Sequence, residues 1–432
     1  MNYFLKDIVR LLNGTVHGNG NLNAEIQDLL IDSRSLASTE HSLFFALVGE
    51  RHNGHKFIED LFQKRVRNFV VSTLPEDLSL FPGCVFILVK DTLASLQHLA
   101  ATHRKKFKIP VIGITGSNGK TMVKEWLFQL LQEDKNVVRS PKSYNSQVGV
   151  PLSVWLTNEQ NQIAIFEAGI SKPGEMEKLE TIVSPTIGIF TNVGQAHDEN
   201  FLNTKQKIRE KLKLFIHAET LIFNRDNLEL NDEVVSNPVI KKLNLFTWSK
   251  KTKANLQIAK ITKQGNETVL QGIYNNEFID ISIPYTDEAS IENGIHCWAV
   301  LLLLKYSNNV ISQRMRHLSP VAMRLELKEG INNCSVINDS YNSDLSSLAI
   351  ALDFLNQQKQ NPKKTLVLSD IFQSGKSEAE LYAEVSELIK GKGINRFIGI
   401  GEALSRQSNL FSADKSFYKS TEDFLENCKP DF

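Results

Sequence analysis

The chain has 432 residues, enough for about three domains of ordinary size. Lys and Arg together number 49, as do Asp and Glu, so no strong positive field points to nucleic acid or a membrane surface. The apolar run at residues 298–304 is too short to cross a bilayer, and the four scattered cysteines form no metal-binding or disulfide pattern. The N-terminal residues carry charges within their apolar stretch and lack the features of a signal peptide. We therefore expect a cytoplasmic α/β protein.

Short apolar segments rich in β-branched residues predict strands along most of the chain. Their ranges are 66–72, 85–89, 109–114, 163–166, 187–190, 220–223, 365–368 and 397–400. Helical patterns separate many of them, which is typical of parallel sheets built from βαβ units. Residues 254–285 instead form short alternating runs around Asn and Gly, which predict antiparallel hairpins inserted in an α/β domain.

Two changes of pattern predict the domain boundaries. A helical segment at residues 93–104 ends before a basic run and a new strand. Later, near Ser319 and Pro320, a leucine-rich helix and a basic run give way to fresh alternation of strands and helices. We therefore predict three domains, at residues 1–106, 107–317 and 318–432.

The strongest local signal is the segment GITGSNGKT at residues 113–121, between an apolar strand and an amphipathic helix. In this context backbone N–H groups enclose phosphate oxygens, and the start of the helix favours negative charge. The predicted ATP-binding residues are Gly116, Ser117, Asn118, Gly119, Lys120 and Thr121. Lys120 would reach the β- and γ-phosphates, and the hydroxyl of Thr121 would bind Mg²⁺. Ile114 stands where the strict pattern has glycine, and a glycine-rich turn without a ligand is the alternative.

This variant loop resembles that of the Mur ligases, the ATP-dependent amide-forming enzymes of peptidoglycan precursor synthesis. Further segments follow in the family's order: SYNSQVGVPL at 143–152, EAG at 167–169 with GE at 174–175, NVGQAH at 192–197, Asn293, Arg324 and NDSYN at 338–342. The resemblance implies a three-domain α/β architecture, with a central parallel-sheet domain that binds ATP through the phosphate loop and a Rossmann-like C-terminal domain. It is closest to the member that adds D-alanyl-D-alanine to UDP-N-acetylmuramoyl-tripeptide.

The resemblance also implies where substrates bind. In the first domain Ser33 and Arg34 would hold the uridine nucleotide, since a guanidinium offers two parallel hydrogen bonds to phosphate. A simple Asp-Ser-Arg surface turn is the alternative. Asn145, Ser146 and Asn342 would contact the peptide substrates.

Glu167 and His197 are the predicted metal ligands together with Thr121. Glu167 ends the strand at 163–166, and His197 follows the strand at 187–190. Ligands of open parallel sheets bind beyond the carboxyl ends of strands, where the phosphate loop also lies. Imidazole is an unusual ligand for Mg²⁺, which prefers oxygen, so an ordinary loop histidine and a solvated glutamate remain alternatives.

Lys211 lies in the charged run KQKIREKLK at 205–213 and, from the sequence alone, looks like one more charge on a solvated helix face. The resemblance implies a carbamylated, metal-binding lysine at a fixed distance after the metal-binding histidine, and Lys211 has that distance from His197. The family usually has glycine next, where this chain has Leu212. Lys207 and Lys213 are the alternative candidates.

Three residues in the second half of the chain complete the predicted nucleotide site. Asn293 would contact adenine, Arg324 the phosphates, and Asp339 the ribose. The family has two acids where this chain has Asn338 and Asp339, so the second acid is kept. A salt bridge in the domain linker is the alternative for Arg324.

The implied reaction activates a carboxylate with ATP and Mg²⁺ to an acyl phosphate, which the amine of D-alanyl-D-alanine attacks. One alternative is a sister ligase that adds diaminopimelate or lysine, but its Asp-Asn-Pro-Arg motif is absent. A folylpolyglutamate-synthase-like enzyme and a non-catalytic nucleotide-binding scaffold are the others. The family continues beyond the strand at 397–400 with another helix and strand. We therefore expect this chain to be the N-terminal part of a longer polypeptide, ending in that strand or in a fused alanine racemase.

Overall fold

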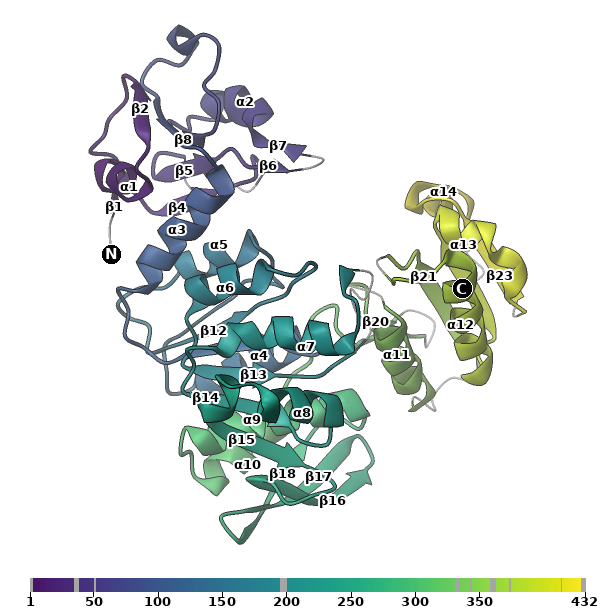
Figure 1. Cartoon of the computed structure of the whole chain (residues 1–432). Helices are drawn as coiled ribbons and strands as arrows, with labels where there is room; N and C mark the ends of the chain where they lie inside the picture. Colours follow the sequence, from purple (N-terminus) through teal and green to yellow (C-terminus); the bar gives the residue numbers. More distant parts are fainter. Residues whose placement is uncertain are drawn as a thin grey trace. The chain divides into compact units, whose positions relative to one another are not determined.

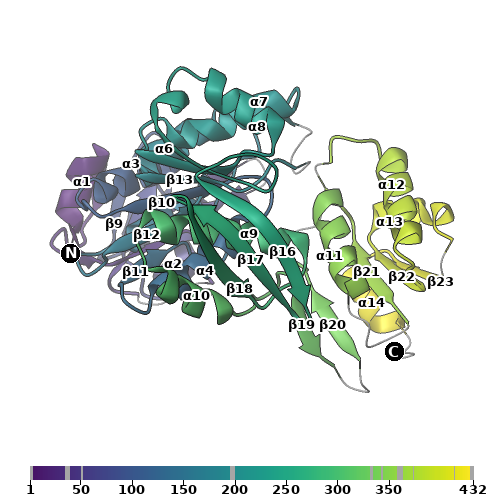
Figure 2. The ribbon, with the colours of Figure 1, turned by 90° about the horizontal axis from the view of Figure 1, so that it is seen from below.

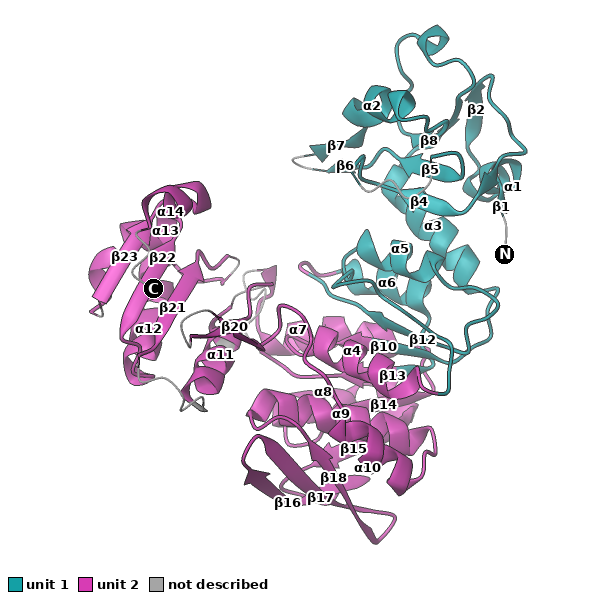
Figure 3. Ribbon diagram, turned by 180° about the vertical axis from the view of Figure 1, so that it is seen from behind, with its two compact units in different colours: residues 1–113, 134–170, 174–187 teal, residues 114–133, 171–173, 188–432 magenta. Residues whose placement is uncertain are grey.

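The computed structural model describes residues 3–34, 39–49, 52–194, 200–330, 334–341, 344–357, 363–372, 374–412 and 414–428. It divides into two compact units (Figure 3). Unit 1 contains residues 1–113, 134–170 and 174–187, and unit 2 contains residues 114–133, 171–173 and 188–432. Within the described ranges, no helix has both the length and the apolar character needed to cross a membrane.

The first part of unit 1 is built on a five-stranded sheet (Figure 1). Its order is β2 (Thr15–Gly18), β9 (Val85–Leu88), β8 (Asn68–Val71), β5 (Ser42–Phe45) and β4 (Asp28–Leu30). The helices are α1 (Leu5–Leu12), α2 (Ile58–Gln63) and α3 (Thr92–Arg104), and the short strands are β1 (Tyr3–Phe4), β3 (Glu25–Ile26), β6 (Val48–Gly49) and β7 (His52–Asn53). Strands β4, β5, β8 and β9 pair in parallel, and β2 pairs antiparallel with β9.

The core of this part also contains a residue from much later in the chain. Helix α5 (Gly149–Trp155) ends in Trp155, which packs in one cluster with Tyr3 and the inner face of the sheet. The indole N–H of Trp155 donates to the carbonyl oxygen of Gln27 at 2.7 Å, and its ring lies 4.7 Å from that of His103. The segment that follows the predicted substrate-binding residues Asn145 and Ser146 is therefore fixed to the N-terminal sheet.

A nine-stranded sheet is formed by the middle part of the chain. Its order is β11 (Val137–Arg139), β12 (Ile163–Glu167), β10 (Val111–Thr115), β13 (Ile187–Phe190), β14 (Thr220–Asn224), β15 (Asn244–Ser249), β16 (Leu256–Gln264), β17 (Glu267–Tyr274) and β18 (Glu277–Ile283). The predicted strands and the predicted hairpins are confirmed, because β16, β17 and β18 pair antiparallel (Figure 2). Asn275 and Asn276 form the turn between β17 and β18 with φ of 51° and 65°, which asparagine tolerates well.

The helices of the central part include α4 (Lys120–Leu131), α6 (Glu175–Val183), α7 (Thr204–Leu212), α8 (Leu228–Ser236), α9 (Glu288–Leu303) and α10 (Asn308–Arg316). The amphipathic stripe predicted on α4 is buried at every position: Val123, Trp126, Leu127, Leu130 and Leu131. Burial of this face fixes the helix that begins at Lys120, and so it fixes the end of the phosphate loop.

The last part of the chain has a hairpin and a small parallel sheet. The hairpin pairs β19 (Glu326–Glu329) with β20 (Ser335–Asn338), and the sheet has the order β21 (Thr365–Ser369), β22 (Arg396–Ile400) and β23 (Asp414–Tyr418). Its helices are α11 (Leu345–Gln357), α12 (Glu378–Gly391), α13 (Glu402–Arg406) and α14 (Thr421–Asn427). Parallel strands connected by helices are the Rossmann-like pattern predicted for this region.

Candidate active site

The phosphate loop connects β10 to α4, and two of its glycines are required by the backbone. Gly116 has φ of 144° and Gly119 has φ of 82°, both in the region that side chains disfavour. A Cβ atom would overlap with the hydroxyl of Thr191 at the first position and with the amide of Asn293 at the second. Ile114, the departure from the strict motif, lies in β10 and is fully buried. The substitution therefore falls in the strand and leaves the loop intact.

The segment after β13 holds the loop by hydrogen bonds. The N–H of Ser117 donates to the carbonyl oxygen of Asn192 at 3.0 Å, and the N–H of Asn118 donates to the side-chain oxygen of Asn192 at 2.8 Å. Thr191 donates its hydroxyl to the carbonyl oxygen of Asn118 at 2.6 Å. Asn192 was part of the motif that suggested a metal site, but its role as the support of the loop could not be inferred from sequence.

Lys120 is bent back onto its own loop. Its ammonium donates to the carbonyl oxygens of Gly116 at 2.8 Å and Ser117 at 2.9 Å. Thr121 follows in the first turn of α4 and is largely buried. These two side chains are placed at the loop as the motif predicts.

Two lysines of α7 are buried against this region. Lys211 is 4% exposed and donates to the carbonyl oxygen of Gly116 at 3.0 Å, and Lys207 is 1% exposed and donates to the carbonyl oxygen of Gly194. Lys213, the third candidate, is more exposed and forms an ion pair with Glu210 at 2.8 Å. The interpretation of this run as a solvated helix face is therefore wrong for Lys207 and Lys211, because α7 packs with their side chains inward. Carbamylation of Lys211 stays a prediction.

Helix α9 places Asn293 beside Gly119, as its predicted nucleotide contact requires. One turn later, His296 is fully buried and its Nε2 lies 2.9 Å from the carbonyl oxygen of Thr191. Since a carbonyl only accepts, Nε2 carries the proton, and Nδ1 accepts from the indole of Trp248 at 3.2 Å. Burial lowers the pKa of His296 to about 4, so the ring is neutral. No sequence motif indicated this support for Thr191.

Three predicted residues of unit 1 belong to β12 or to the segment bonded to the loop after it. Glu167 is fully buried, and its N–H donates to the hydroxyl of Ser140 at 3.3 Å. The carbonyl oxygen of Asn145 accepts from the N–H of Gly169 at 2.8 Å, and the hydroxyl of Ser146 accepts from the N–H of Gly149 at 3.1 Å. The segment that contains Asn145 and Ser146 is thus tied to the loop after β12.

Two predicted residues, His197 and Asn342, lie outside the described residues, so their roles stay predictions.

Ser33 and Arg34 lie in a turn of unit 1. The guanidinium of Arg34 pairs with Asp32 at 2.7 Å and is itself largely exposed. This pairing lowers the pKa of Asp32 to about 2. The head group of Arg34 is held in a defined place while its outer face is open to solvent.

Arg324 and Asp339 flank one short segment in the last part of the chain. The guanidinium of Arg324 lies 4.3 Å from the ring centre of Tyr341, and a carboxylate oxygen of Asp339 accepts from the N–H of Leu325 at 3.2 Å. Burial raises the pKa of Asp339 to about 6. Met323 and Leu325 have φ of 59° and 47°, so the backbone on both sides of Arg324 is strained.

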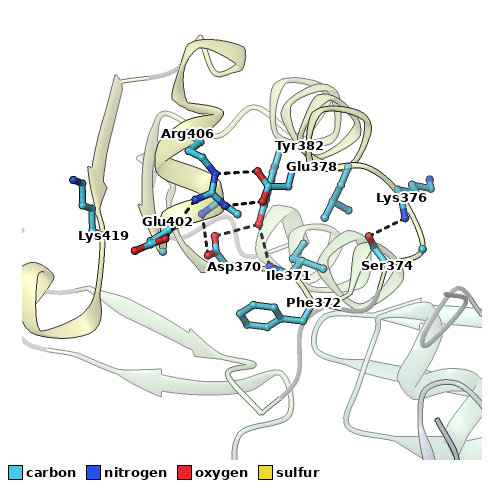
Figure 4. Close-up of a pocket in the computed structure, with 14 residues that line it drawn as sticks. Asp370, Ile371, Phe372, Ser374, Lys376, Glu378, Tyr382, Glu402, Arg406 and Lys419 are labelled. Atoms are coloured by element: carbon cyan, nitrogen blue, oxygen red, sulfur yellow. Dashed lines mark hydrogen bonds and ion pairs between the residues drawn. The ribbon is translucent and has the colours of Figure 1, made fainter. Parts of the chain in front are cut away.

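A cavity of about 720 Å³ lies at the carboxyl ends of β21, β22 and β23 (Figure 4). Asp370 organises its floor: it accepts from the N–H groups of Ala403 and Leu404 at 3.1 and 2.8 Å and from the hydroxyl of Tyr382 at 3.2 Å. Arg406 bonds with Glu378 at 2.6 Å on the wall. Lys419 also lines the cavity, and within the described residues no carboxylate pairs with its ammonium.

Comparison with known proteins identifies the family. The Mur ligase middle domain matches residues 114–301, the part that contains the phosphate loop, Asn192, Lys211 and Asn293. A UDP-N-acetylmuramoyl-tripeptide–D-alanyl-D-alanine ligase of Bacillus subtilis is 28% identical over 98% of this chain and 92% of its own length. The Escherichia coli ligase of the same name is 26% identical over 96% of this chain and 90% of its own. Residues 114–301 are a Mur ligase middle domain, and the chain resembles ligases of this family along nearly its whole length.

Solved structures agree with the fold described above. A MurF structure from Acinetobacter baumannii superposes with a TM-score of 0.83 at 21% identity, covering 99% of this chain and 92% of that one. MurF of Thermotoga maritima in complex with ADP gives 0.73 at 20% identity, covering 93% and 92%. The predicted fold class is thereby confirmed. The matched relatives are ligases along nearly the whole of this chain. The helix and strand expected after residues 397–400 are present as α13 and β23.

Proposed function

We propose that this protein joins D-alanyl-D-alanine to UDP-N-acetylmuramoyl-tripeptide at the expense of ATP, in cytoplasmic peptidoglycan precursor synthesis. The observation that carries the proposal is the likeness to ligases of that name along almost the entire chain, the N-terminal part included. In this proposal residues 1–106 bind the uridine end through Ser33 and Arg34, residues 107–317 bind ATP, and residues 318–432 contact its ribose and phosphates through Asp339 and Arg324.

The loop at residues 116–121 fits the triphosphate of ATP. Because its two required glycines have no side chain, phosphate oxygens can approach the backbone N–H groups of the loop. The ammonium of Lys120 is held within the loop. Thr121, Glu167, His197 and carbamylated Lys211 would hold Mg²⁺, and the carboxylate of Glu167 is an oxygen ligand of the kind that Mg²⁺ prefers. When bound, Mg²⁺ supplies positive charge that neutralises the phosphate oxygens.

In the reaction, Lys120 has to exchange the carbonyl oxygens of Gly116 and Ser117 for phosphate oxygens. Its charge then stabilises the negative charge on the transferred phosphoryl group, which is the main catalytic task in such chemistry. The carboxylate of the tripeptide attacks the γ-phosphate and forms an acyl phosphate, with ADP leaving. The amine of D-alanyl-D-alanine then attacks the acyl carbon and releases phosphate. Asn145 and Ser146 position the peptide in this proposal.

The cavity in the last part of the chain suits the dipeptide, which carries one positive and one negative end. Lys419 offers a cation for the carboxylate, and Glu402 is a candidate partner for the amine. Phe372 lines the cavity with its side chain 77% exposed, so it offers an apolar wall for a methyl group. On this basis Lys419→Ala should raise the KM for D-alanyl-D-alanine and leave the KM for ATP unchanged.

The test of the function is direct. The protein is incubated with ATP, Mg²⁺, D-alanyl-D-alanine and the UDP-N-acetylmuramoyl-tripeptide that contains either diaminopimelate or lysine, and product mass and phosphate release are measured. We expect one added dipeptide per ATP consumed and no product with Lys120→Met. A product formed only from UDP-N-acetylmuramoyl-dipeptide and a free third amino acid would instead identify a sister ligase. Absence of phosphate release with every substrate would identify a nucleotide-binding scaffold.

A further inference from the structure

Lys207 is a buried cation that the proposed reaction does not use. It lies in α7, which begins after the N-cap residue Asn203, and its side chain is only 1% exposed. Lys211 is also buried, whereas two other basic residues nearby are more exposed. Arg209 is 64% exposed and pairs with Glu233 at 2.6 Å, and Lys213 pairs with Glu210. Lys207 is thus the most deeply buried basic residue of this helix, and it lies beside the segment that follows β13.

The ammonium of Lys207 connects to the phosphate loop through two residues. It donates to the carbonyl oxygen of Gly194. That carbonyl also accepts from the hydroxyl of Ser117 at 3.1 Å, and the N–H of Gly194 donates back to the same hydroxyl at 2.9 Å. Ser117 is one of the loop residues, and its own N–H is held by Asn192. A chain of contacts therefore runs from Lys207 through Gly194 to Ser117.

The burial of Lys207 is costly for stability. Moving an ammonium out of water is unfavourable, and a methionine of similar length would fill the same space without that cost. A buried charged group is kept in a folded protein by its polar partners, and removing one member of a buried polar contact is usually destabilising. The contact of Lys207 with Gly194 is the one that leads to the phosphate loop.

We propose that Lys207 is a positioning residue of the phosphate loop: through Gly194 it fixes the hydroxyl of Ser117, and it places a positive charge beside the site of the nucleotide phosphates. This inference rests on the proposed nucleotide-binding function. It predicts an effect on ligands that carry phosphate and none on a ligand that lacks it.

The experiment measures binding of ATP, ADP and adenosine to the whole chain by titration calorimetry, together with the melting temperature. For Lys207→Met we expect the Kd for ATP and ADP to rise roughly tenfold or more and the affinity for adenosine to stay unchanged; the melting temperature shows whether the variant is folded. Lys213→Met is the matched control, because it removes a more exposed lysine at the C-cap of the same helix, and it should bind all three ligands like the wild type.

Ser117→Ala tests the same contacts from the loop side, and its effect on ATP binding should be less than additive with that of Lys207→Met. The inference is overturned if Lys207→Met binds ATP as the wild type does, or if it loses adenosine and ATP equally, which would indicate a general structural role. If Lys207→Met does not fold, unchanged ATP binding in Ser117→Ala overturns it. A wild-type chain that binds no ATP would instead remove the proposed function itself.

Discussion

Lys120 and Lys211 donate to the same carbonyl oxygen, that of Gly116, at 2.8 and 3.0 Å. One lysine belongs to the phosphate loop, and the other comes from α7. Two ammonium groups that meet at one carbonyl create strong positive potential where the phosphates are expected. In the proposed cycle both side chains have to leave the carbonyl oxygen of Gly116. Lys120 turns toward the phosphate. Lys211 turns away once it is carbamylated, because its negative charge is repelled by that oxygen.

The first prediction concerns Lys120. Lys120→Met should lower the ligation rate at least about 10²-fold, because the charge on the transferred phosphoryl group loses its nearest cation. The helix stripe of α4 is unaffected, so the circular dichroism spectrum and melting temperature should stay close to those of the wild type. Near-normal turnover in a folded Lys120→Met protein would refute the assignment of the loop.

The second prediction concerns Lys211. An unmodified Lys211 can hold Gly116, but only the carbamylated form is an anion able to bind metal. Lys211→Ala should therefore lose ligase activity, and high bicarbonate or small carboxylates such as acetate should restore part of it. Activity is measured with and without these anions, and intact mass measured in bicarbonate buffer should show the added carbon dioxide in the wild type. Full activity of Lys211→Ala without any anion would contradict the prediction.

The sequence was sufficient for the eight strands that it predicted, the hairpins, the loop and α4, because these depend on local pattern. It did not identify which lysines of α7 are buried. The apolar residues of that helix are Ile208 and Leu212. Each follows directly after a buried lysine, Lys207 or Lys211, so the buried face of the helix contains both apolar and basic side chains. Whether such a lysine is solvated depends on the carbonyl groups of distant segments, here Gly116 and Gly194, which no local pattern encodes.

Roles that act across the fold were missed for the same reason. His296 has no motif, yet its neutral ring supports Thr191 beside the loop. The place of Trp155 in the core of the N-terminal sheet comes from the docking of α5, which is a tertiary event.

The third prediction concerns the uridine end of the substrate. Arg34 is held by Asp32 with its guanidinium exposed, so it is available for phosphate. Arg34→Ala should raise the KM for the UDP-linked substrate, with kcat and the affinity for ATP little changed, because the contact lies far from the chemistry. Steady-state kinetics with each substrate varied in turn provide the measurement. A change confined to the KM for ATP would rule out this assignment.

The fourth prediction concerns the cavity floor. Gly401 has φ of 136°, and a Cβ atom there would collide with the carboxylate of Asp370, which caps the first turn of α13. Gly401→Ala should therefore destabilise the protein by at least about 2 kcal/mol in urea unfolding. Gly391→Ala in α12 is the matched control, since its added methyl group meets nothing within 4 Å and should be neutral or slightly stabilising. Equal stability of the two variants would contradict the role of Gly401.

The last prediction concerns acid stability and His103 in unit 1. Its Nε2 lies 2.8 Å from the carbonyl oxygen of Thr157, so Nε2 carries the proton, and Nδ1 accepts from the hydroxyl of Tyr3 at 2.9 Å. Burial lowers the pKa of His103 from 6.5 to about 4, and the neutral ring is the form that fits these partners.

Between pH 6.5 and about 4 the unfolded chain binds a proton at His103 and the folded chain does not. The contribution of His103 to stability is therefore complete above pH 6.5 and is lost as the pH falls through this window, by roughly 3 kcal/mol in total. His103→Gln disturbs the contacts of the imidazole, so its free energy of unfolding should be lower at pH 7.5. Because glutamine does not titrate, this free energy should fall less between pH 7.5 and 5. Urea unfolding at several pH values measures the free energy of unfolding of both proteins. In the difference between the two, the titration of the shared carboxylates and of His296 cancels. An identical pH dependence in the two proteins would show that the imidazole of His103 is not the group that titrates.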